Sequence, residues 1–308
     1  LSYLLRRSKR TCFGGNRFMW ILFTLLAAFM QAWRNAFQSQ LSKEVKVAGV
    51  TLARFIWAGP IAALYLALLY LWNNVGLPHF TAEFFGFIIG ASMMQILATG
   101  LMVKLFQQQN FAIGAGLAKS EAIVAAILGT LFFGTHLSLL GWAGVILGGI
   151  AVFLLSAKQG LRQLSLSTVI LGIASGSAFA LTSLWVREAS LRLDVGFPHS
   201  AAWVLLLVIS LQTIVLASYL VLKDKETLIG LLQRPKLTLL TSTTSCFGSI
   251  GWFSAMSLQT VPYVKTLGQV EIFFMMLISA FWLKERVKIK EMLGLALIAV
   301  AAILVMWG

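Results

Sequence analysis

The sequence has very little charge for its length. Of 308 residues only 11% are Asp, Glu, Lys or Arg, against about 25% in a typical soluble protein, and only 10 residues are acidic. Cysteine and proline are also scarce, with 2 and 5 residues. Low charge with high hydrophobicity excludes an intrinsically disordered chain. The two cysteines, Cys12 and Cys246, lie in very different settings, so we expect neither a disulfide scaffold nor a structural disulfide.

Apolar residues are correspondingly abundant. They make up 59% of the chain, more than a soluble fold could bury. A helix that crosses a bilayer needs about 20 mostly apolar residues. The sequence therefore predicts an all-α integral membrane protein with ten transmembrane helices. We place them at residues 18–40, 47–72, 82–107, 111–134, 137–157, 167–189, 200–222, 237–258, 262–283 and 287–307.

Basic residues outnumber acidic ones by 24 to 10, which gives a net charge of +14. In a soluble protein this excess would suggest nucleic acid. Here the bases lie mostly in short connectors and in residues 1–17, so we interpret them as contacts with lipid headgroups and expect no nucleic-acid partner. Residues 1–17 form a basic N-terminal tail. The apolar stretch that follows is too long for a signal peptide and has no small-residue cleavage pattern.

An internal repeat divides the chain. Residues 110–157 align with 260–307 at a constant offset of 150, which pairs Glu121 with Glu271. Two five-helix repeats follow, at 18–157 and 167–307, joined by a connector at 158–166. An odd number of spans per repeat makes the two halves inverted relative to each other. Inverted repeats are typical of secondary transporters, whose site lies between the halves near the membrane midplane.

The motifs of this repeat resemble those of the drug/metabolite transporter superfamily, within its EamA-type ten-helix carriers. In that family the fourth helix of each repeat has a central Glu, then an apolar stretch that ends in a Gly-Glu-Arg turn, then a Gly-rich fifth helix. The corresponding segments here are 119–121 (Lys-Ser-Glu), 134–136 (Gly-Thr-His), 269–271 (Gln-Val-Glu) and 284–286 (Lys-Glu-Arg). Two departures are the absence of Pro after either Glu and of Glu-Arg in the first turn.

The resemblance implies a secondary transporter of the cytoplasmic (inner) membrane, an exporter or exchanger, with both termini in the cytoplasm. The basic tail agrees with that orientation under the positive-inside rule, whereas the bases of several later connectors oppose it. We expect no cofactor, and protons or a counter-substrate as coupling partners. The state in the membrane is a monomer or a homodimer. Gly144 and Gly148 form a G-x-x-x-G pair that suits packing within the bundle or a dimer face.

Charges near the centres of the predicted helices are the candidate site. A charge inside a membrane costs about 2.5–3.5 kcal/mol on insertion scales and so needs a reason. Arg34, Lys119, Glu121 and Glu271 are expected either to surround a central cavity or to form structural ion pairs between helices. The shallower or neighbouring candidates for substrate binding or coupling are Arg54, Lys265, Gln269, Trp33 and Trp252.

Two bases and two acids lie well inside the helices, and the shallower Arg54, Lys104 and Lys265 raise the bases to five. This surplus predicts a small metabolite that carries a carboxylate or phosphate, such as an amino acid, organic acid or phosphorylated compound. The alternative is an aromatic cavity for neutral, zwitterionic or lipophilic cationic compounds, with the bases neutralised by the two glutamates. A buried carboxyl, Glu121 or Glu271, is a hypothesis for proton coupling. An integral-membrane enzyme is the other alternative. We do not expect it, because the sequence has no His metal pattern, Asp-rich motif or G-x-S-x-G.

Overall fold

The computed structural model describes residues 16–108, 118–158, 166–281 and 289–307, and within them the secondary structure is entirely helical. The basic tail predicted at 1–17 falls almost wholly outside these residues. The helices, in chain order, are α2 (Asn16–Leu41), α3 (Val47–Ala53), α4 (Ala58–Trp72), α5 (Ala82–Gln108), α7 (Glu121–Phe132), α8 (Leu139–Lys158), α9 (Leu166–Arg192), α10 (His199–Lys223), α11 (Lys225–Leu232), α12 (Pro235–Leu258), α13 (Val261–Leu267), the 3-10 turn η3 (Gly268–Val270), α14 (Glu271–Phe281) and α15 (Ile289–Trp307).

The fold is that of an all-helical membrane protein. Within the described residues, five segments are long and apolar enough to cross a membrane: Val47–Trp72, Ala82–Gln107, Leu166–Arg192, His199–Lys223 and Val261–Ile278. Shorter apolar helices lie at Glu121–Phe132, Leu139–Val152 and Ala296–Trp307. Many large apolar side chains point outward, as Leu139 does with 90% of its surface exposed. An outer surface of this kind suits lipid rather than water.

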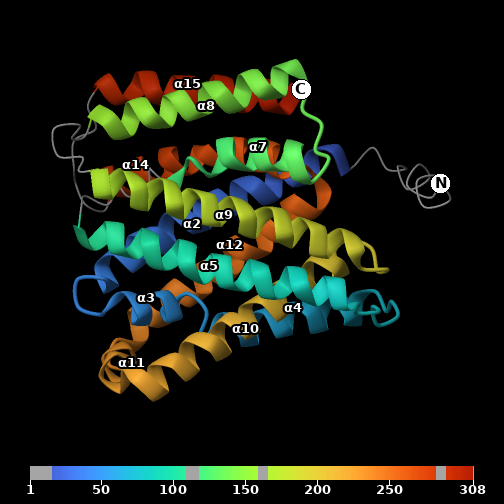
Figure 1. The fold of residues 1–308 in the computed structure, drawn as a ribbon, viewed down its shortest axis with the longest axis vertical. Coiled ribbons are helices and arrows are strands. Elements are labelled where there is room, and N and C mark those ends of the chain that lie inside the picture. Colours follow the sequence, from blue (N-terminus) through green and yellow to red (C-terminus); the bar gives the residue numbers. More distant parts are fainter. Residues whose placement is uncertain (1–15, 109–117, 159–165, 282–288, 308) are drawn as a thin grey trace.

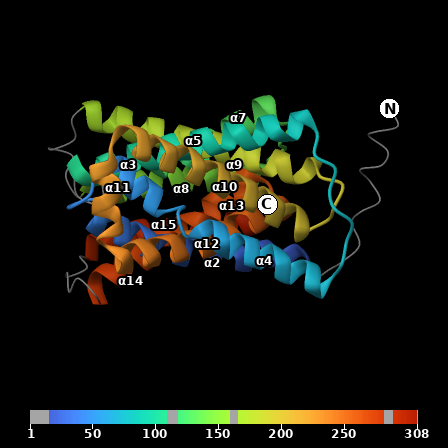
Figure 2. The same ribbon diagram turned by 90° about the horizontal axis from the view of Figure 1, so that it is seen from below.

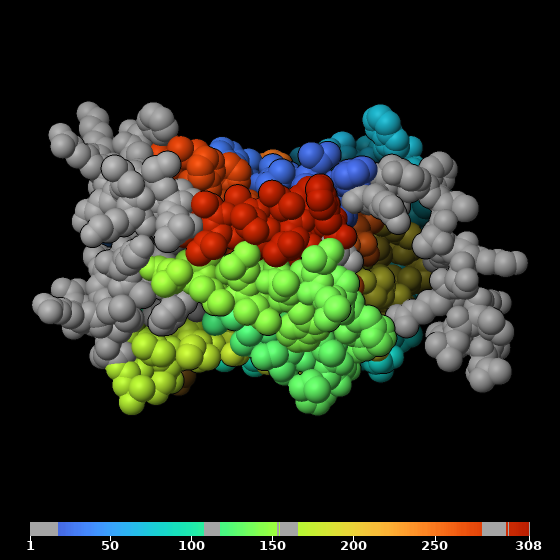
Figure 3. Space-filling view, turned by 90° about the horizontal axis from the view of Figure 1, so that it is seen from above, coloured from blue at the N-terminus to red at the C-terminus, as the bar shows by residue number. Residues whose placement is uncertain are grey.

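The long helices run side by side in one bundle (Figures 1 and 2). The most extensive packing joins α2 to α12 and α5 to α9, and these four helices form the middle of the bundle. Helices α8 and α15 pack together along one outer face, which Figure 3 shows directly. Helices α4 and α10 pack together at the opposite side. The four middle helices therefore lie between two outer helix pairs.

The G-x-x-x-G pair of α8 packs against other helical segments of the same chain. A Cβ atom built on Gly144 would lie 2.6 Å from Val305 Cγ2 and 3.0 Å from the Ala301 carbonyl oxygen of α15. A Cβ on Gly148 would overlap the side-chain amide of Gln269 in η3. Both glycines thus allow close helix packing within the bundle.

Three apolar segments that the sequence presents as single spans are interrupted. Residues 54–57 separate α3 from α4, and Pro60 lies just after the break, where it has no N–H to donate to residue 56. A turn at Lys119 and Ser120 precedes α7, and η3 separates α13 from α14. Glu121 and Glu271 are consequently the first residues of α7 and α14. Both glutamates thus follow directly on an irregular turn in an apolar span.

A short helix that the sequence analysis did not predict, α11, lies at one end of the bundle. Asp224 caps its N-terminus by accepting a hydrogen bond from the Thr227 N–H at 3.2 Å. The same carboxylate pairs with Lys46 at 3.0 Å, and Arg234 pairs with Glu44. These two ion pairs tie the connector between α2 and α3 to the flanks of α11.

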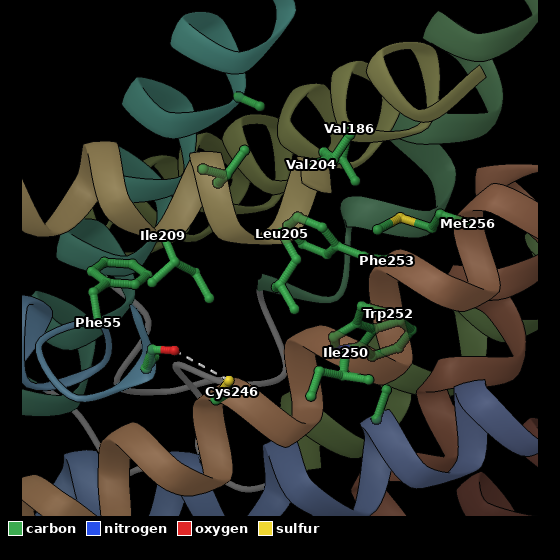
Figure 4. Close-up of a cluster of buried hydrophobic side chains, with 14 of the residues drawn as sticks. Phe55, Val186, Val204, Leu205, Ile209, Cys246, Ile250, Trp252, Phe253 and Met256 are labelled. Atoms are coloured by element: carbon green, nitrogen blue, oxygen red, sulfur yellow. Dashed lines mark hydrogen bonds between the residues drawn. The ribbon is translucent and has the colours of Figure 1, made fainter. Parts of the chain in front are cut away.

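An apolar cluster fixes the part of α12 that faces the site. In Figure 4, Cys246, Ile250 and Phe253 of α12 lie against Leu205 and other apolar residues of α10. The Cys246 thiol is fully buried and donates weakly to the Ala58 carbonyl at 3.5 Å. Trp252 belongs to the same cluster with only 5% of its surface exposed, so its ring is held rigidly where α12 passes the middle of the bundle.

Candidate functional site

A polar cavity lies among the inner helices of the bundle. Its described walls come from α2, α5, α9 and α12, from the break after α3, and from the broken spans that contain α7, α13 and α14. The side chains around it are Gln31, Arg34, Asn35, Arg54, Gln95, Met102, Ala118, Lys119, Glu121, Phe179, Thr182, Ser183, Ser249, Trp252, Phe253, Met256, Lys265 and Glu271. Charged and amide groups are thus concentrated at the centre of an otherwise apolar bundle.

Glu271 is the most enclosed charge in this cavity. Its side chain has 0% of its surface exposed, and both carboxylate oxygens are occupied. Oε1 accepts a hydrogen bond from Asn35 Nδ2 at 2.6 Å. Oε2 accepts from Gln31 Nε2 at 2.5 Å and pairs with the Lys119 ammonium group. Three donors from two segments of the chain therefore surround one carboxylate.

The orientation of both amides is fixed by their other partners. The Trp252 indole N–H donates to Gln31 Oε1 at 2.8 Å, and an indole nitrogen can only donate. Arg34 Nη2 donates to Asn35 Oδ1 at 2.7 Å, and a guanidinium can also only donate. The NH₂ group of each amide must therefore face Glu271, and the carboxylate must accept from both.

Glu121 has a different environment, although the 150-residue offset pairs it with Glu271. The Lys265 ammonium lies 2.8 Å from Glu121 Oε1, and the Ser183 hydroxyl donates to the same oxygen at 2.9 Å. Glu121 Oε2 has no hydrogen-bond partner among the described residues. About 11% of the Glu121 side chain is exposed, so water can reach it from the cavity. The Lys265 ammonium also lies 4.0 Å from the centre of the Trp252 ring, a cation–π contact.

The two ion pairs cross between distant parts of the sequence. Lys119 and Glu121 lie two residues apart and point to different partners, as expected from helix geometry. Each contributes one partner to a pair completed by Lys265 or Glu271, some 150 residues later. Of the four charges for which ion pairs were one expectation, Lys119, Glu121 and Glu271 are paired, with Lys265 as the fourth partner, and Arg34 is not.

Arg34 and Arg54 remain without a carboxylate partner among the described residues. Arg34 contacts Asn35 Oδ1 through Nε at 3.2 Å as well as through Nη2. Arg54 donates to Thr99 Oγ1 at 2.7 Å and to Ser245 Oγ at 3.1 Å. Only 2% of either residue's surface is exposed. Both guanidinium groups are therefore held by neutral partners, and their charge is not cancelled by a bond to an acid.

Seven of the nine predicted site residues line this cavity: Arg34, Arg54, Lys119, Glu121, Trp252, Lys265 and Glu271. The other two are not among the lining residues. Trp33 is half-buried and stacks on Phe37, with 5.7 Å between ring centres. Gln269 is fully buried beside Gly148, and its amide has no hydrogen-bond partner within the described part of the chain.

The sequence analysis missed several members of the site. Gln31, Asn35 and Ser183 bind the two carboxylates but were not predicted. Gln31, Arg34, Asn35 and Gln38 recur at the helical spacing of three and four residues, so they form one polar stripe on an apolar helix. That spacing could have identified Gln31 and Asn35, but not Ser183.

The charge of the cavity is positive and its space is small. Four bases and two acids line it, a surplus of two positive charges among the described residues. The volume that can hold the centre of a water molecule is about 30 Å³, enough for a few waters at most. A metabolite does not fit without movement of the surrounding helices. In the described part of the chain no group of three or more His, Cys, Asp or Glu is placed to hold a metal ion.

Comparison with known proteins shows the fold alone. No protein-family model and no curated protein sequence matches the chain. Chains of solved structures do match, and 28 were found. One of them, described only as "Crystal structure of protein", has a TM-score of 0.69 and 14% sequence identity over 94% of this chain and 97% of its own length. The architecture therefore also occurs in a protein of very different sequence.

Proposed function

We propose that this protein is a secondary transporter that moves a small anionic metabolite across the cytoplasmic membrane by alternating access, as an exporter or exchanger. The observation that carries the proposal is the buried cavity with two guanidinium groups that form no direct ion pair with an acid among the described residues. In the membrane interior an isolated charge is expensive and is retained for function. Arg is also well suited to bind carboxylate and phosphate groups.

The transporter architecture in this proposal has ten spans in two inverted halves, 18–157 and 167–307. Its support is the symmetry of the helix packing. The first helix of one half packs on the third of the other in both directions, as α2 on α12 and α9 on α5. The second helices pair as α4 with α10, and the fifth pair as α8 with α15. Two halves related by a two-fold axis would pack in this way.

The broken spans add to this argument. The fourth helix of each half is interrupted immediately before its glutamate, and Glu121 and Glu271 then begin α7 and α14. Discontinuous helices at the centre of a bundle are typical of binding sites in secondary transporters, because helix ends carry unpaired backbone groups. The narrow cavity also fits a carrier that must change conformation to admit its substrate.

The aromatic alternative, a carrier of lipophilic cations, has less support. A cation would need the open face of an aromatic ring. The Lys265 ammonium already lies over the Trp252 ring, and the surplus positive charge of the cavity repels a second cation. Anionic and, less strongly, zwitterionic substrates are therefore favoured over cationic ones.

Thermal-shift measurements in detergent, against a panel of anionic, zwitterionic and cationic metabolites, test the proposal. We expect anions to raise the melting temperature of the wild type, and Arg34→Gln and Arg54→Gln to lose most of that shift. Lys104→Gln is the matched control, because Lys104 is a base of α5 whose side chain points away from the cavity. The proposal fails if only cations stabilise the protein, or if all three variants respond to anions like the wild type.

A further inference from the structure

The two repeat-related glutamates do not have equivalent surroundings, and the difference decides which of them can bind a proton. Glu271 must accept hydrogen bonds from two amide NH₂ groups whose orientation Trp252 and Arg34 fix. Oε2 of Glu271 accepts from both Gln31 and Lys119, and Oε1 accepts from Asn35, so a proton on Glu271 would compete with three donors in a site with no exposed surface. Displacing a buried donor costs free energy, in addition to the lost Lys119 pair. Glu271 is therefore surrounded by donors that suit a carboxylate without a proton.

Glu121 tolerates a proton. Among the residues that the structure describes, both of its bonds are made to Oε1, which leaves Oε2 for an added proton. The Ser183 hydroxyl can rotate, so it can accept as well as donate when the carboxyl becomes neutral. The 11% exposure of Glu121 lets cavity water deliver the proton, whereas Glu271 is completely enclosed.

We propose that Glu121 is the proton-binding site of the carrier, and that its protonation releases Lys265 to bind the anionic group of the substrate. The proton comes from cavity water and is bound at Glu121 Oε2. The Lys265 ammonium then loses its carboxylate partner but keeps its contact with Trp252, which holds it at the cavity wall. A proton and an anion would thus bind together. This inference rests on the proposed function, since it requires an anion site.

The charges around Glu121 give the direction of the effect. Its neighbours across the cavity are Arg34, Arg54, Lys119 and Glu271, in addition to Lys265. On α9, the packed face presents Ser183, while Arg187 one turn later donates to backbone carbonyl oxygens at the end of α12. Protonation changes the cavity from a surplus of two positive charges to three. Anion affinity therefore rises as the pH falls.

Sulfate is a suitable probe because it keeps its two negative charges from pH 5.5 to 8.5. Its affinity for the purified protein can be measured by the quenching of tryptophan fluorescence, since Trp252 lines the cavity. For the wild type we expect the affinity to increase as pH falls, by at most about tenfold per pH unit, which is the limit for one proton linked to one anion. Sulfate binding in a weakly buffered solution should also take up protons.

Glu121→Gln resembles the protonated residue. We expect its sulfate affinity at pH 8 to equal that of the wild type at low pH and to be independent of pH, with no proton uptake. Glu83→Gln, at an exposed acid of α5, is the control and should keep the wild-type slope. Glu271→Gln should keep the slope in whatever binding remains.

The outcomes separate the two proposals. If sulfate binds the wild type with the same affinity at every pH, or if Glu121→Gln keeps the wild-type slope, the role of Glu121 is wrong and the anion carrier stands. If the slope is lost in Glu271→Gln but not in Glu121→Gln, the assignment is reversed. If neither sulfate nor any anion of the panel binds at any pH, both proposals fail.

Discussion

The buried Lys119–Glu271 pair allows a quantitative test of how this bundle is held together. Its two side chains are 11% and 0% exposed, so water does not screen the interaction. Removing one partner of such a pair typically costs about 3–5 kcal/mol, because the other charge is left buried and unpaired. In Lys119→Met, Glu271 would keep its bonds from Gln31 and Asn35. We therefore expect a loss near the lower end, about 3 kcal/mol in the free energy of unfolding.

The measurement is an unfolding titration with SDS in mixed micelles, followed by circular dichroism. The double variant Lys119→Met/Glu271→Gln removes both charges, so its loss should be smaller than the sum of the two single losses by about 1–3 kcal/mol. Lys46→Met breaks the exposed pair with Asp224 and serves as the control, with a much smaller loss expected. If Lys119→Met lowers the free energy of unfolding no more than Lys46→Met does, or if the two single losses are additive, the pair does not hold the helices together.

Three further predictions concern other parts of the bundle. Gly144→Leu should separate α8 from α15 and lower the melting temperature strongly, because even a Cβ atom there would lie 3.0 Å from an α15 carbonyl oxygen. Gly86→Leu is the control and should have little effect, because a Cβ atom on Gly86 would have no neighbour within 4 Å. Cys246 should resist maleimide labelling in the folded protein and react after denaturation, in a variant whose other cysteine is serine. The pKa of Asp224 is lowered, above all by hydrogen bonds from Thr227. The ionised carboxylate therefore stabilises the fold at pH values above the ordinary pKa of Asp, and this stabilisation is lost as the pH falls through the lowered pKa. Asp224→Asn should weaken the acid dependence of unfolding.

The positions of the helices could be predicted from the sequence because a membrane span needs only length and hydrophobicity. The predicted segments at 18–40, 82–107 and 200–222 correspond to α2, α5 and α10 within a few residues. The predicted segment at 111–134 can be compared only in part, since residues 109–117 lie outside the described ones. The short helix α11 was missed because its eight residues carry no span-length apolar signal, and its start depends on a cap and an ion pair with the distant Lys46.

The helix breaks are harder to predict, and they position the site. Pro60 gives a local reason for the break before α4. No proline lies at the break before Glu121 or Glu271, where the interruption lies beside charges that bond to other helices. The individual charges could be found because a charge in an apolar segment is conspicuous. Their partners could not, because the bonds from Gln31 and Asn35 to Glu271 depend on tertiary packing, which spacing along one helix does not specify.

The crossed ion pairs connect the two proposals. Lys119 and Glu121 belong to the first half of the proposed repeat, and Lys265 and Glu271 to the second, so both pairs join one half to the other. A motion that separates the halves at the cavity must break both pairs together, which opposes opening when nothing replaces the lost partners. An anion that enters the cavity offers Lys265 a new partner, and a proton on Glu121 removes the need for the old one. With both bound, the Lys265–Glu121 pair no longer opposes movement, and only the Lys119–Glu271 pair must still be broken. Movement of the loaded carrier would then cost less than movement of the unloaded one, as coupled transport without a leak requires.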